Sequence, residues 1–425
     1  MKKRSDLTFM EDFDILFLGG VYPESQYEKI RKNCKGNMQN AANNHQWMLI
    51  EGLEKNLGRP INILNFMFVG SFPLRYKKPF IKTFSFSHKD KANDINVGFF
   101  NFTGLKQLIL KRKVKIYLKK WDKKSFSKRK ILIVYSPQTY FLKGVNYIKR
   151  LNPKIETCIV IPDLPQFTSL EKHSMIFNLY KKYNLRIFNN EIHNFDYYVL
   201  ITETMKEFLK IDNKPSVVIE TLVNCHNTEL MNQGLIIKKQ EIKTILYSGT
   251  LTEKYGILEL IEAFKKIEKE NYRLIICGEG ETRDKVIEET KKDQRIIYKG
   301  LISRDEVIKL QQKATVLVNP RKSEGFTRFS FPSKISEYLC AGKPVICYKL
   351  EGIPVEYDDY LIYVEDNSID SLKEKLVEIC EKDEKVLKEI GERNKRFVSE
   401  NKNNVVQTRK IINMLNIFGD ENEEI

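Results

Sequence analysis

The residue types best suited to chemistry are concentrated between Asn319 and Ile346. Their order is that of a strand, a loop, a helix and a second strand, and a loop that leads into a helix presents backbone N–H groups to an anion. Pro332 suits the first turn of this helix, where its missing N–H does no harm. Lys334 adds a positive charge in the same turn, and Glu337 can accept hydrogen bonds from the paired hydroxyls of a ribose. These residue types predict a site for a phosphate and a sugar.

The elements that must position this site follow a repeated pattern. Short β-branched runs alternate with longer amphipathic stretches, which is typical of βα units around a parallel sheet. In the first half, strands are expected at residues 14–18, 61–65, 131–135, 157–161, 197–201 and 217–219, with a helix over 38–57. In the second half, strands are expected at 243–248, 272–277, 295–298, 315–319, 344–348 and 361–364. Helices are expected there at 257–267, 282–291, 304–312 and 333–341, and then at 371–381, 385–398 and 405–417.

This pattern predicts an α/β fold with two doubly wound, Rossmann-like domains that face each other across a cleft. A chain of 425 residues also exceeds the usual size of one hydrophobic core. We place the first domain at 1–230 and the second at 240–400, because the rhythm is lost between 224 and 242. A C-terminal helix at about 400–418 is expected to pack back on the first domain. Ligands bind at the carboxyl ends of the strands in such sheets.

Cysteine and histidine usage argues against a metal centre. The seven cysteines form no CxxC pair, and the five histidines lack ligand spacing. We therefore expect buried free thiols in a reducing compartment and no bound metal. Met1 to Arg4 is basic, but acidic residues interrupt the apolar core that a signal peptide would need, and no apolar run reaches the length of a membrane span. A cytoplasmic location is the expectation.

The formal charge of +16 is concentrated in one stretch, from Lys111 to Lys130. Apolar residues such as Leu118 and Trp121 are interleaved with its lysines, and Asp122 is its single acid. One interpretation is a basic amphipathic surface that contacts an anionic membrane, or an acidic substrate displayed on lipid. The other is a solvated face in a chain rich in lysine throughout. No nucleic-acid module follows from the pattern, so no nucleic-acid partner is expected.

The second half resembles glycosyltransferase family 4, whose members are retaining enzymes with the GT-B fold. The block from Asn319 to Ile346 is similar to the C-terminal signature of this family, with Glu-Gly-Phe, a helix carrying a second Glu, and Ala-x-Gly-x-Pro-Val-Ile. Further matches follow in order over about residues 243–365: Tyr247-Ser248-Gly249-Thr250-Leu251, Lys254-Tyr255-Gly256, Leu260-Ile261-Glu262-Ala263-Phe264, Cys277-Gly278-Glu279-Gly280 and Lys299-Gly300-Leu301.

The resemblance implies roles for individual residues. Glu337 would bind the ribose hydroxyls, Lys254 would neutralise the donor diphosphate during catalysis, and the catalytic Glu324 would approach the donor sugar. The other donor-binding positions that it implies are Gly249, Thr250, Gly278, Gly280, Gly325, Phe326, Arg328, Ser333 and Lys334. The donor is a nucleoside-diphosphate sugar used as a substrate, and no cofactor is expected.

Two departures from the family pattern bear on these roles. Thr250 stands where members usually have Arg, so that Arg321, Arg328 or Lys334 is a candidate replacement. Glu324 and Glu337 are farther apart than the paired glutamates of the family, and Phe329 occupies the usual position of the first. Either residues 327–331 are a short insertion or the first carboxylate is absent.

The first domain is expected to hold the acceptor. Gly19 and Gly20 end the first strand, where a glycine backbone can approach the donor phosphate or simply form a tight turn. Asp163 follows another strand and is the candidate for orienting or deprotonating an acceptor hydroxyl, although it can also cap the segment that follows.

The sequence thus predicts a retaining hexosyltransferase. Its acceptor would be a saccharide or a polyprenyl-linked saccharide, and its role would be in the assembly of cell-surface polysaccharide at the inner face of the plasma membrane. The alternatives are a sugar-nucleotide epimerase, an inverting transferase of similar architecture, and a catalytically degenerate GT-B subunit that supports a partner transferase. The substitutions at Thr250 and Phe329 suggest the last of these.

Overall fold

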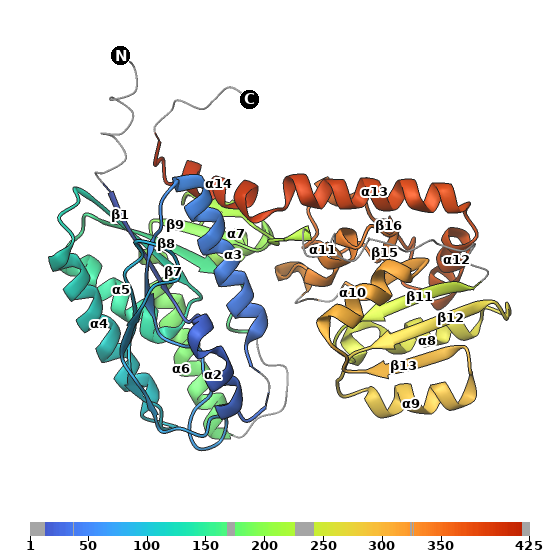
Figure 1. The fold of residues 1–425 in the computed structure, drawn as a ribbon, viewed down its shortest axis with the longest axis horizontal. Coiled ribbons are helices and arrows are strands. Elements are labelled where there is room, and N and C mark those ends of the chain that lie inside the picture. The colour runs from blue at the N-terminus through green and yellow to red at the C-terminus, as the bar shows by residue number, and fades with distance from the viewer. Residues whose placement is uncertain are drawn as a thin grey trace, which may run out of the picture. The chain divides into compact units, whose positions relative to one another are not determined.

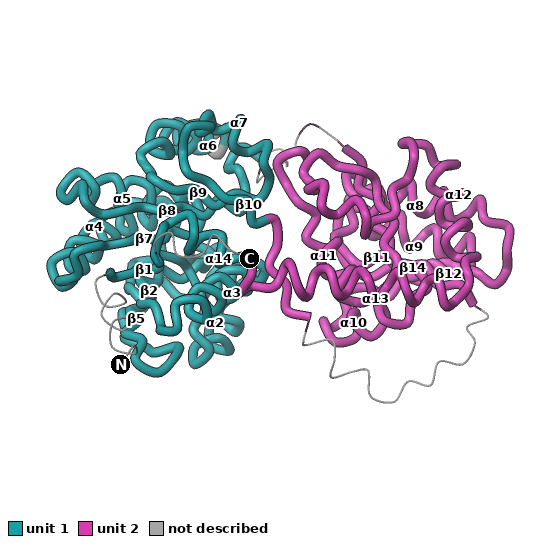
Figure 2. Tube along the Cα trace, turned by 90° about the horizontal axis from the view of Figure 1, so that it is seen from above, with its two compact units in different colours: residues 1–219, 407–425 teal, residues 220–406 magenta. Residues whose placement is uncertain are grey.

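The computed structural model describes residues 13–36, 38–167, 175–225, 242–323, 325 and 327–418. The chain forms two units of mixed α/β structure (Figure 1). Unit 1 comprises Met1–Ile219 and Gln407–Ile425, and unit 2 comprises Glu220–Val406 (Figure 2). The chain therefore passes between the units twice, after residue 219 and after residue 406.

Unit 1 is built on an eight-stranded sheet of order β10-β9-β8-β7-β1-β2-β5-β4. Its strands are β1 (Phe13–Gly19), β2 (Asn62–Asn65), β4 (Phe84–Phe86), β5 (Asp94–Asn96), β7 (Arg129–Tyr135), β8 (Ile155–Ile161), β9 (Tyr197–Leu200) and β10 (Ser216–Val218). All neighbours pair in parallel except β4 with β5. The central strands β1, β7 and β8 are almost entirely buried, as strands covered on both faces must be. The six strands predicted for this half are confirmed.

The helices of unit 1 lie on both sides of this sheet. They are α2 (Tyr27–Asn33), α3 (Asn40–Leu57), α4 (Lys106–Lys124), α5 (Thr139–Leu151), α6 (Met175–Glu191), α7 (Thr204–Leu209) and α14 (Asn404–Met414). Helices α4 and α5 pack together on one side, and α3 lies on the other (Figure 1). The returning helix α14 contacts α3, where Asn56 donates from Nδ2 to Thr408 Oγ1 at 3.0 Å. Most of α14 belongs to unit 1.

A segment between β2 and α4 was not predicted. It contains β3 (Phe80–Ile81) and β6 (Phe99–Phe100), which form a separate antiparallel pair, as well as the short strands β4 and β5. These strands are two or three residues long. Runs of this length are too short for an alternation of apolar and polar residues to be recognised.

A mostly buried histidine, His88, links this segment to the sheet through hydrogen bonds. The two ring nitrogens of His88 lie 2.7 Å from Asp94 Oδ2 and 2.8 Å from Glu54 Oε1. Glu54 and Asp94 also accept the backbone N–H groups of Ile61 and Ile63, at the start of β2. Burial alone would lower the pKa of His88, but the hydrogen bonds and charges of the two carboxylates outweigh it and raise the pKa to about 9. His88 is therefore a cation at neutral pH.

This raised pKa makes stability depend on pH in a defined window. Since an unfolded histidine has a pKa of about 6.5, the stabilisation by charged His88 is complete below that pH and is lost as the pH rises toward 9. We expect the free energy of unfolding, measured by urea titration, to decrease between pH 6.5 and 9. His88→Gln should make this decrease smaller. The same substitution at the exposed His193 should leave the decrease as it is in the unchanged protein. An unchanged slope in His88→Gln would contradict the assignment.

Unit 2 contains a six-stranded, fully parallel sheet of order β13-β12-β11-β14-β15-β16. Its strands are β11 (Lys243–Ser248), β12 (Tyr272–Cys277), β13 (Ile296–Gly300), β14 (Val316–Asn319), β15 (Val345–Cys347) and β16 (Ile362–Tyr363). Its helices are α8 (Ile257–Lys265), α9 (Arg283–Lys292), α10 (Arg304–Lys313), α11 (Ser333–Cys340), α12 (Ile369–Cys380) and α13 (Glu384–Asn401). Every strand and helix predicted for this region is present, with ends that differ by a few residues.

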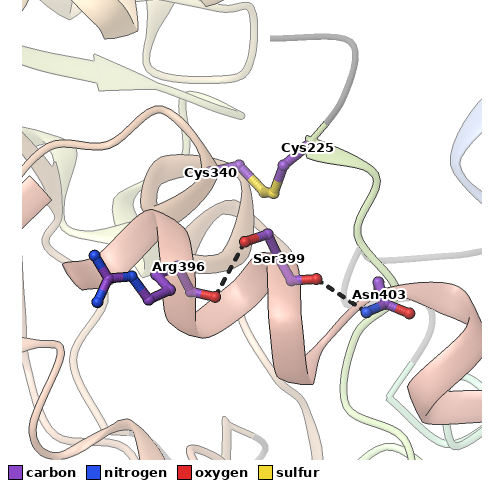
Figure 3. The surroundings of a disulfide bond; sticks show 5 residues. All are labelled: Cys225, Cys340, Arg396, Ser399 and Asn403. Carbon is purple, nitrogen blue, oxygen red and sulfur yellow. Dashed lines mark hydrogen bonds between the residues drawn. A yellow bond between two sulfur atoms is a disulfide. The ribbon is translucent and has the colours of Figure 1, made fainter. Parts of the chain in front are cut away.

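The prediction that all seven cysteines are free thiols is wrong for two of them. Cys225 and Cys340 form a disulfide, although 115 positions separate them in the sequence (Figure 3). Cys340 is the last residue of α11, and Cys225 lies on the segment that enters unit 2. Only the tertiary fold brings them together, so their spacing could not indicate the bond. The remaining cysteines are free.

A buried ion cluster lies next to both passages of the chain between the units. Lys402 Nζ contacts Glu220 at 2.8 Å and Glu356 at 2.5 Å, and Tyr357 Oη donates to Glu220 Oε1 at 2.7 Å. The side chains of Lys402 and Glu220 are each only 1% exposed. Tyr357 also lies beneath the ammonium group, whose nitrogen is 5.0 Å from the ring centroid. Burial raises the pKa of Tyr357 well above its usual value, so the phenol keeps the proton that it donates.

Among the residues that the structure describes, no helix has both the length and the apolar character needed to cross a bilayer.

Candidate functional site

The predicted site residues of unit 2 lie along one edge of its sheet. The six strands run parallel, so their carboxyl ends meet at the same edge. The loops after β11, β12 and β14 carry Thr250, Gly278 and Arg321, and α11 starts beyond the last of these loops. This edge is where doubly wound sheets bind ligands.

Two glycine loops at this edge pack backbone against backbone. A Cβ atom on Gly278, whose φ is +138°, would lie 1.8 Å from the carbonyl oxygen of Gly249. A Cβ atom on Gly280 would lie 2.1 Å from that of Leu251. The amides of Gly249 and Leu251 donate to the carbonyls of Cys277 and Glu279 at 3.0 and 2.9 Å. Packing within the protein thus explains Gly278 and Gly280, and the two amides are already engaged inside the fold.

A third glycine, Gly256, allows close packing between two loops: the turn that contains Lys254 and the loop after β14. Gly256 has a φ of +73°, and a Cβ atom there would lie 2.0 Å from the carbonyl oxygen of Pro320. Lys254 is exposed in the turn before it, Glu253–Tyr255. The guanidinium carbon of Arg321 lies 5.0 Å from the ring centroid of Tyr255. The fold therefore brings Lys254 and Arg321 onto adjacent loops.

Glu337 is held by two partners of different kinds. Its Oε1 accepts from Gln311 Nε2 at 3.0 Å, and its Oε2 accepts from Lys334 Nζ at 2.8 Å. Gln311 is 1% exposed and also donates to Ser248 Oγ at 3.1 Å, at the last residue of β11. The Glu337 side chain keeps 34% of its surface exposed. The carboxylate is thus fixed from the protein side and open on the other.

Tyr338 supports the same corner from within the core. Its hydroxyl accepts from the backbone N–H of Ser248 at 2.8 Å and donates to the Ser248 carbonyl at 3.1 Å. Sequence reasoning missed both Tyr338 and Gln311. A signal for Gln311 did exist, because it lies three residues after buried Ile308 on the inner face of α10. A buried amide on that face must bond a polar group of the core.

The loop between β14 and α11 carries two further cations. Arg321 is 8% exposed and donates from Nη2 to Ser330 Oγ at 2.9 Å. Arg328 lies 3.3 Å from Glu351. Ser333 is the exposed first residue of α11, and a Cβ atom on Gly325 would meet nothing within 4 Å. Glu324 and Phe326 lie outside the described residues.

The carboxyl edge of the unit 1 sheet has its own polar cluster. Asp163 follows β8 and is exposed, but desolvation by the protein atoms around its carboxyl group raises its pKa to about 6. Its charge contributes, after burial, to raising the pKa of Tyr135 at the end of β7. Tyr135 Oη lies 3.2 Å from His45 Nδ1. Burial lowers the pKa of His45 to about 4, so that this imidazole is neutral at pH 7.

Sequence reasoning missed a role for His45 in this cluster, whereas residues 135–139, which include Ser136, were expected at a strand end that could line the same pocket. Ser136 directly follows β7 with a φ of +73°, a conformation that costs energy for a residue with a side chain and that is enriched at functional sites. Nothing in the sequence predicts a positive φ at a serine. Gly19 and Gly20 are explained by packing, because Cβ atoms there would lie 2.4 Å from Gln46 Oε1 and 2.0 Å from Phe68. The Gly20 amide donates to the same Gln46 oxygen at 2.8 Å.

The residues that could bind a metal are not grouped. Within the described part of the chain, no cluster of three or more His, Cys, Asp or Glu side chains is arranged to hold a metal ion. The candidate site offers cations, amides and carboxylates instead, which suit a phosphorylated sugar.

Comparison with known proteins identifies the second half of the chain. Residues 230–397 match the family described as "Glycosyl transferases group 1". An uncharacterized glycosyltransferase of Methanocaldococcus jannaschii is 30% identical over 194 residues. That match covers 42% of this chain and about half, 53%, of the relative's length.

Similar solved structures extend over nearly the whole chain. Sucrose-phosphate synthase from Thermosynechococcus elongatus has a TM-score of 0.62 at 13% identity, over 95% of this chain and 98% of that chain. The lipopolysaccharide outer core galactosyltransferase WaaB has a TM-score of 0.59 at 15% identity, over 95% and 99% of the two chains. The Anabaena protein HepE, solved in complex with UDP, has a TM-score of 0.58 at 14% identity, over 95% and 99%. The chain has the GT-B fold of these solved structures, and its second unit matches the model of the group 1 glycosyltransferases over residues 230–397.

Proposed function

We propose that this protein is a retaining hexosyltransferase of family 4 that uses a nucleoside-diphosphate sugar. Its acceptor is a hydroxyl of a saccharide or a lipid-linked saccharide in the synthesis of cell-surface polysaccharide. The observation that carries this proposal is the carboxylate of Glu337, which Gln311 and Lys334 hold in place at the carboxyl edge of the unit 2 sheet. A fixed and partly exposed carboxylate suits the paired hydroxyls of a ribose.

The diphosphate is proposed to bind at the start of α11. The first amides of that helix point along its axis and favour an anion. Lys334 lies in the same turn, and Lys254 is exposed on the loop after β11. No described side chain pairs with Lys254. Since the amides of Gly249 and Leu251 are engaged, these lysines and the helix start supply the positive charge. Stabilising the departing diphosphate is the main catalytic contribution.

The remaining roles in the proposal concern the sugar and the acceptor. Glu324, with the backbone of Gly325 and Phe326, is proposed to approach the donor sugar. Asp163 is proposed to orient or deprotonate the acceptor hydroxyl, and its raised pKa suits a group that exchanges a proton near neutral pH. A lipid-linked acceptor places the enzyme at the inner face of the plasma membrane, with the basic stretch Lys111–Lys130 toward anionic lipid.

A donor screen tests the proposal. A ligand that binds only the native state raises its stability by an amount set by concentration over Kd, about 2.7 kcal/mol at 100 times Kd. We expect either UDP-sugars or GDP-sugars to raise Tm, whereas CMP-sugars, which carry a single phosphate, should not. NMR of the product should show a retained anomeric configuration. Inversion would reassign the mechanism. Donor binding without turnover on any acceptor, restored by a partner protein, would establish the degenerate subunit instead, and no binding at all would refute the proposal.

A further inference from the structure

A row of phenylalanines, of which Phe80 is exposed and Phe72, Phe100 and Phe102 are half-buried, lies at the small sheet of unit 1. Phe72, Phe102, Phe100 and Phe80 form a continuous chain of ring contacts, with centroids 4.9, 4.7 and 4.7 Å apart in that order. In the β3–β6 pair, Ile81 and Phe99 are buried, whereas Phe80 and Phe100 face outward together. Phe80 is 64% exposed. The alternation of this strand pair thus places two of its three aromatic side chains on the outer face.

Aliphatic side chains continue this surface onto helix α4. Leu74 is 72% exposed and lies two residues after Phe72. Leu105, which precedes the first residue of α4, is bonded through its backbone N–H to the carbonyl of Phe102 at 3.2 Å. Leu108 is 65% exposed one turn later. We define the apolar ridge as Phe72, Leu74, Phe80, Phe100, Phe102, Leu105 and Leu108. An apolar surface of this extent, on a chain rich in charge, indicates a contact site.

The outer face of α4 extends the ridge with positive charge. The helix buries Leu110, Val114 and Leu118 at intervals of four residues, where it packs on α5. The opposite face leaves Arg112, Lys119 and Lys120 exposed, and Ile116 lies between them at 41% exposure. This arrangement places the cations beside the ridge on the solvent side of the helix.

The charge around the ridge has one sign. Residues 69–82 and 97–121, which contain the whole ridge, include eleven basic residues and no acidic residue. Seven of the eleven are exposed: Arg75, Lys77, Lys78, Lys82, Arg112, Lys119 and Lys120. Lys106 is not one of the exposed cations, and its ammonium group donates a hydrogen bond to the carbonyl of Val69. An apolar surface whose own chain segments carry cations and no acidic residue is complementary to an anionic lipid bilayer, whose phosphates meet the cations while its acyl region receives the apolar side chains.

From this surface we infer that the apolar ridge inserts into the interface of an anionic membrane, with the basic face of α4 contacting the lipid phosphates. A saccharide fits the ridge less well, since phenylalanine and leucine offer no hydrogen-bonding group. A nucleic acid fits the cations but gains nothing from exposed leucines. The inference deepens the proposed function, on which it rests for the lipid-linked acceptor. It adds the side chains that insert, all of which lie outside the basic stretch Lys111–Lys130.

Vesicle binding by the full chain tests the inference. We expect co-sedimentation with vesicles of phosphatidylglycerol and phosphatidylcholine, and much weaker binding to phosphatidylcholine alone. Phe80→Ser with Leu108→Ser should lower the partition coefficient at least about 10-fold. The matched control is Leu301→Ser with Val355→Ser, which changes two apolar residues of unit 2 that are 77% and 79% exposed. This control should bind as the unchanged protein does.

Insertion is measured separately from attraction by charge. In the Leu108→Trp variant, the fluorescence of the new tryptophan should be quenched by lipids that are brominated on their acyl chains. A side chain that only approaches the phosphates stays too far from the bromine atoms to be quenched. Arg112→Gln with Lys119→Gln and Lys120→Gln should weaken binding and reduce its salt dependence.

Three results would overturn the inference. They are full binding by the Phe80 and Leu108 variant, absence of quenching at position 108, and binding to a single-stranded oligonucleotide that equals vesicle binding and is lost with it at high salt. Donor binding is measured without vesicles in the same variants. No donor binding by the unchanged protein, with intact vesicle binding, would refute the proposed function and leave the membrane surface standing. Donor binding by the unchanged protein without vesicle binding would refute only the surface.

Discussion

We expect Glu337→Ala to weaken binding of the nucleoside-diphosphate sugar about 100-fold. A hydrogen bond to a charged group contributes about 1.5 to 3 kcal/mol, and loss of the carboxylate removes at least one such bond to the ribose in the proposed donor complex. The substitution also frees Lys334 and Gln311, which now bond the two carboxylate oxygens. Since the side chain is about one-third exposed, the free energy of unfolding should change little. Calorimetric titration with the donor found in the screen measures the effect.

A matched control separates this role from the loss of a surface ion pair. Glu378 pairs with Lys375 at 2.7 Å, also three residues apart on a helix of unit 2, but on α12. Glu378→Ala should leave donor binding unchanged. Gln311→Leu should give a smaller loss than Glu337→Ala, because the carboxylate remains but is no longer fixed. If Glu337→Ala bound the donor with unchanged affinity, Glu337 would not be part of the donor site. The proposal would then lose the observation on which it rests.

The largest effect on stability is expected for Lys402→Met. This change leaves the carboxylate of Glu220, 1% exposed, without its cation. Removing one partner of a buried pair costs about 3 to 5 kcal/mol, since the remaining charge stays away from water. The hydrogen bond from Tyr357 compensates only partly. Urea unfolding followed by circular dichroism should show unit 2 losing stability by this amount.

Two further variants make this prediction specific. Lys402→Met combined with Glu220→Gln removes both charges and should recover most of the lost stability, because a neutral pair has a small desolvation cost. Lys388→Met breaks an exposed pair with Glu392 at 3.8 Å and should have little effect. If Lys402→Met and Lys388→Met had the same free energy of unfolding, the buried ion cluster would make no contribution to stability.

The sequence predicted the scaffold because the strands of a parallel sheet are nearly continuous apolar runs. Residues 243–248 and 272–277, for example, are strands with the predicted ends. The β3–β6 segment escaped prediction because its strands are too short to show a period. The basic stretch was recognised, but the ridge beside it depends on which phenylalanines the β3–β6 pairing turns outward.

The candidate site was predictable to the level of loops and helix starts. The helix with Lys334 and Glu337 begins at Ser333, within the predicted range. The partners of Glu337 were not predictable, since Gln311 comes from a different helix and Ser248 from a different strand. The packing roles of Gly278 and Gly280 likewise depend on a neighbouring loop. Roles that involve Glu324 and Phe326 stay predictions.

The bond between Cys225 and Cys340 has a practical consequence for every assay proposed above. It anchors the last turn of the helix that bears Glu337 to the segment through which the chain enters unit 2. Reduction by dithiothreitol or glutathione would break this bond. A reduced sample and an oxidised sample would then differ at the C-terminal end of the helix that bears Glu337. Affinities from the two samples belong to two chemical species and are to be compared only after the thiols have been counted.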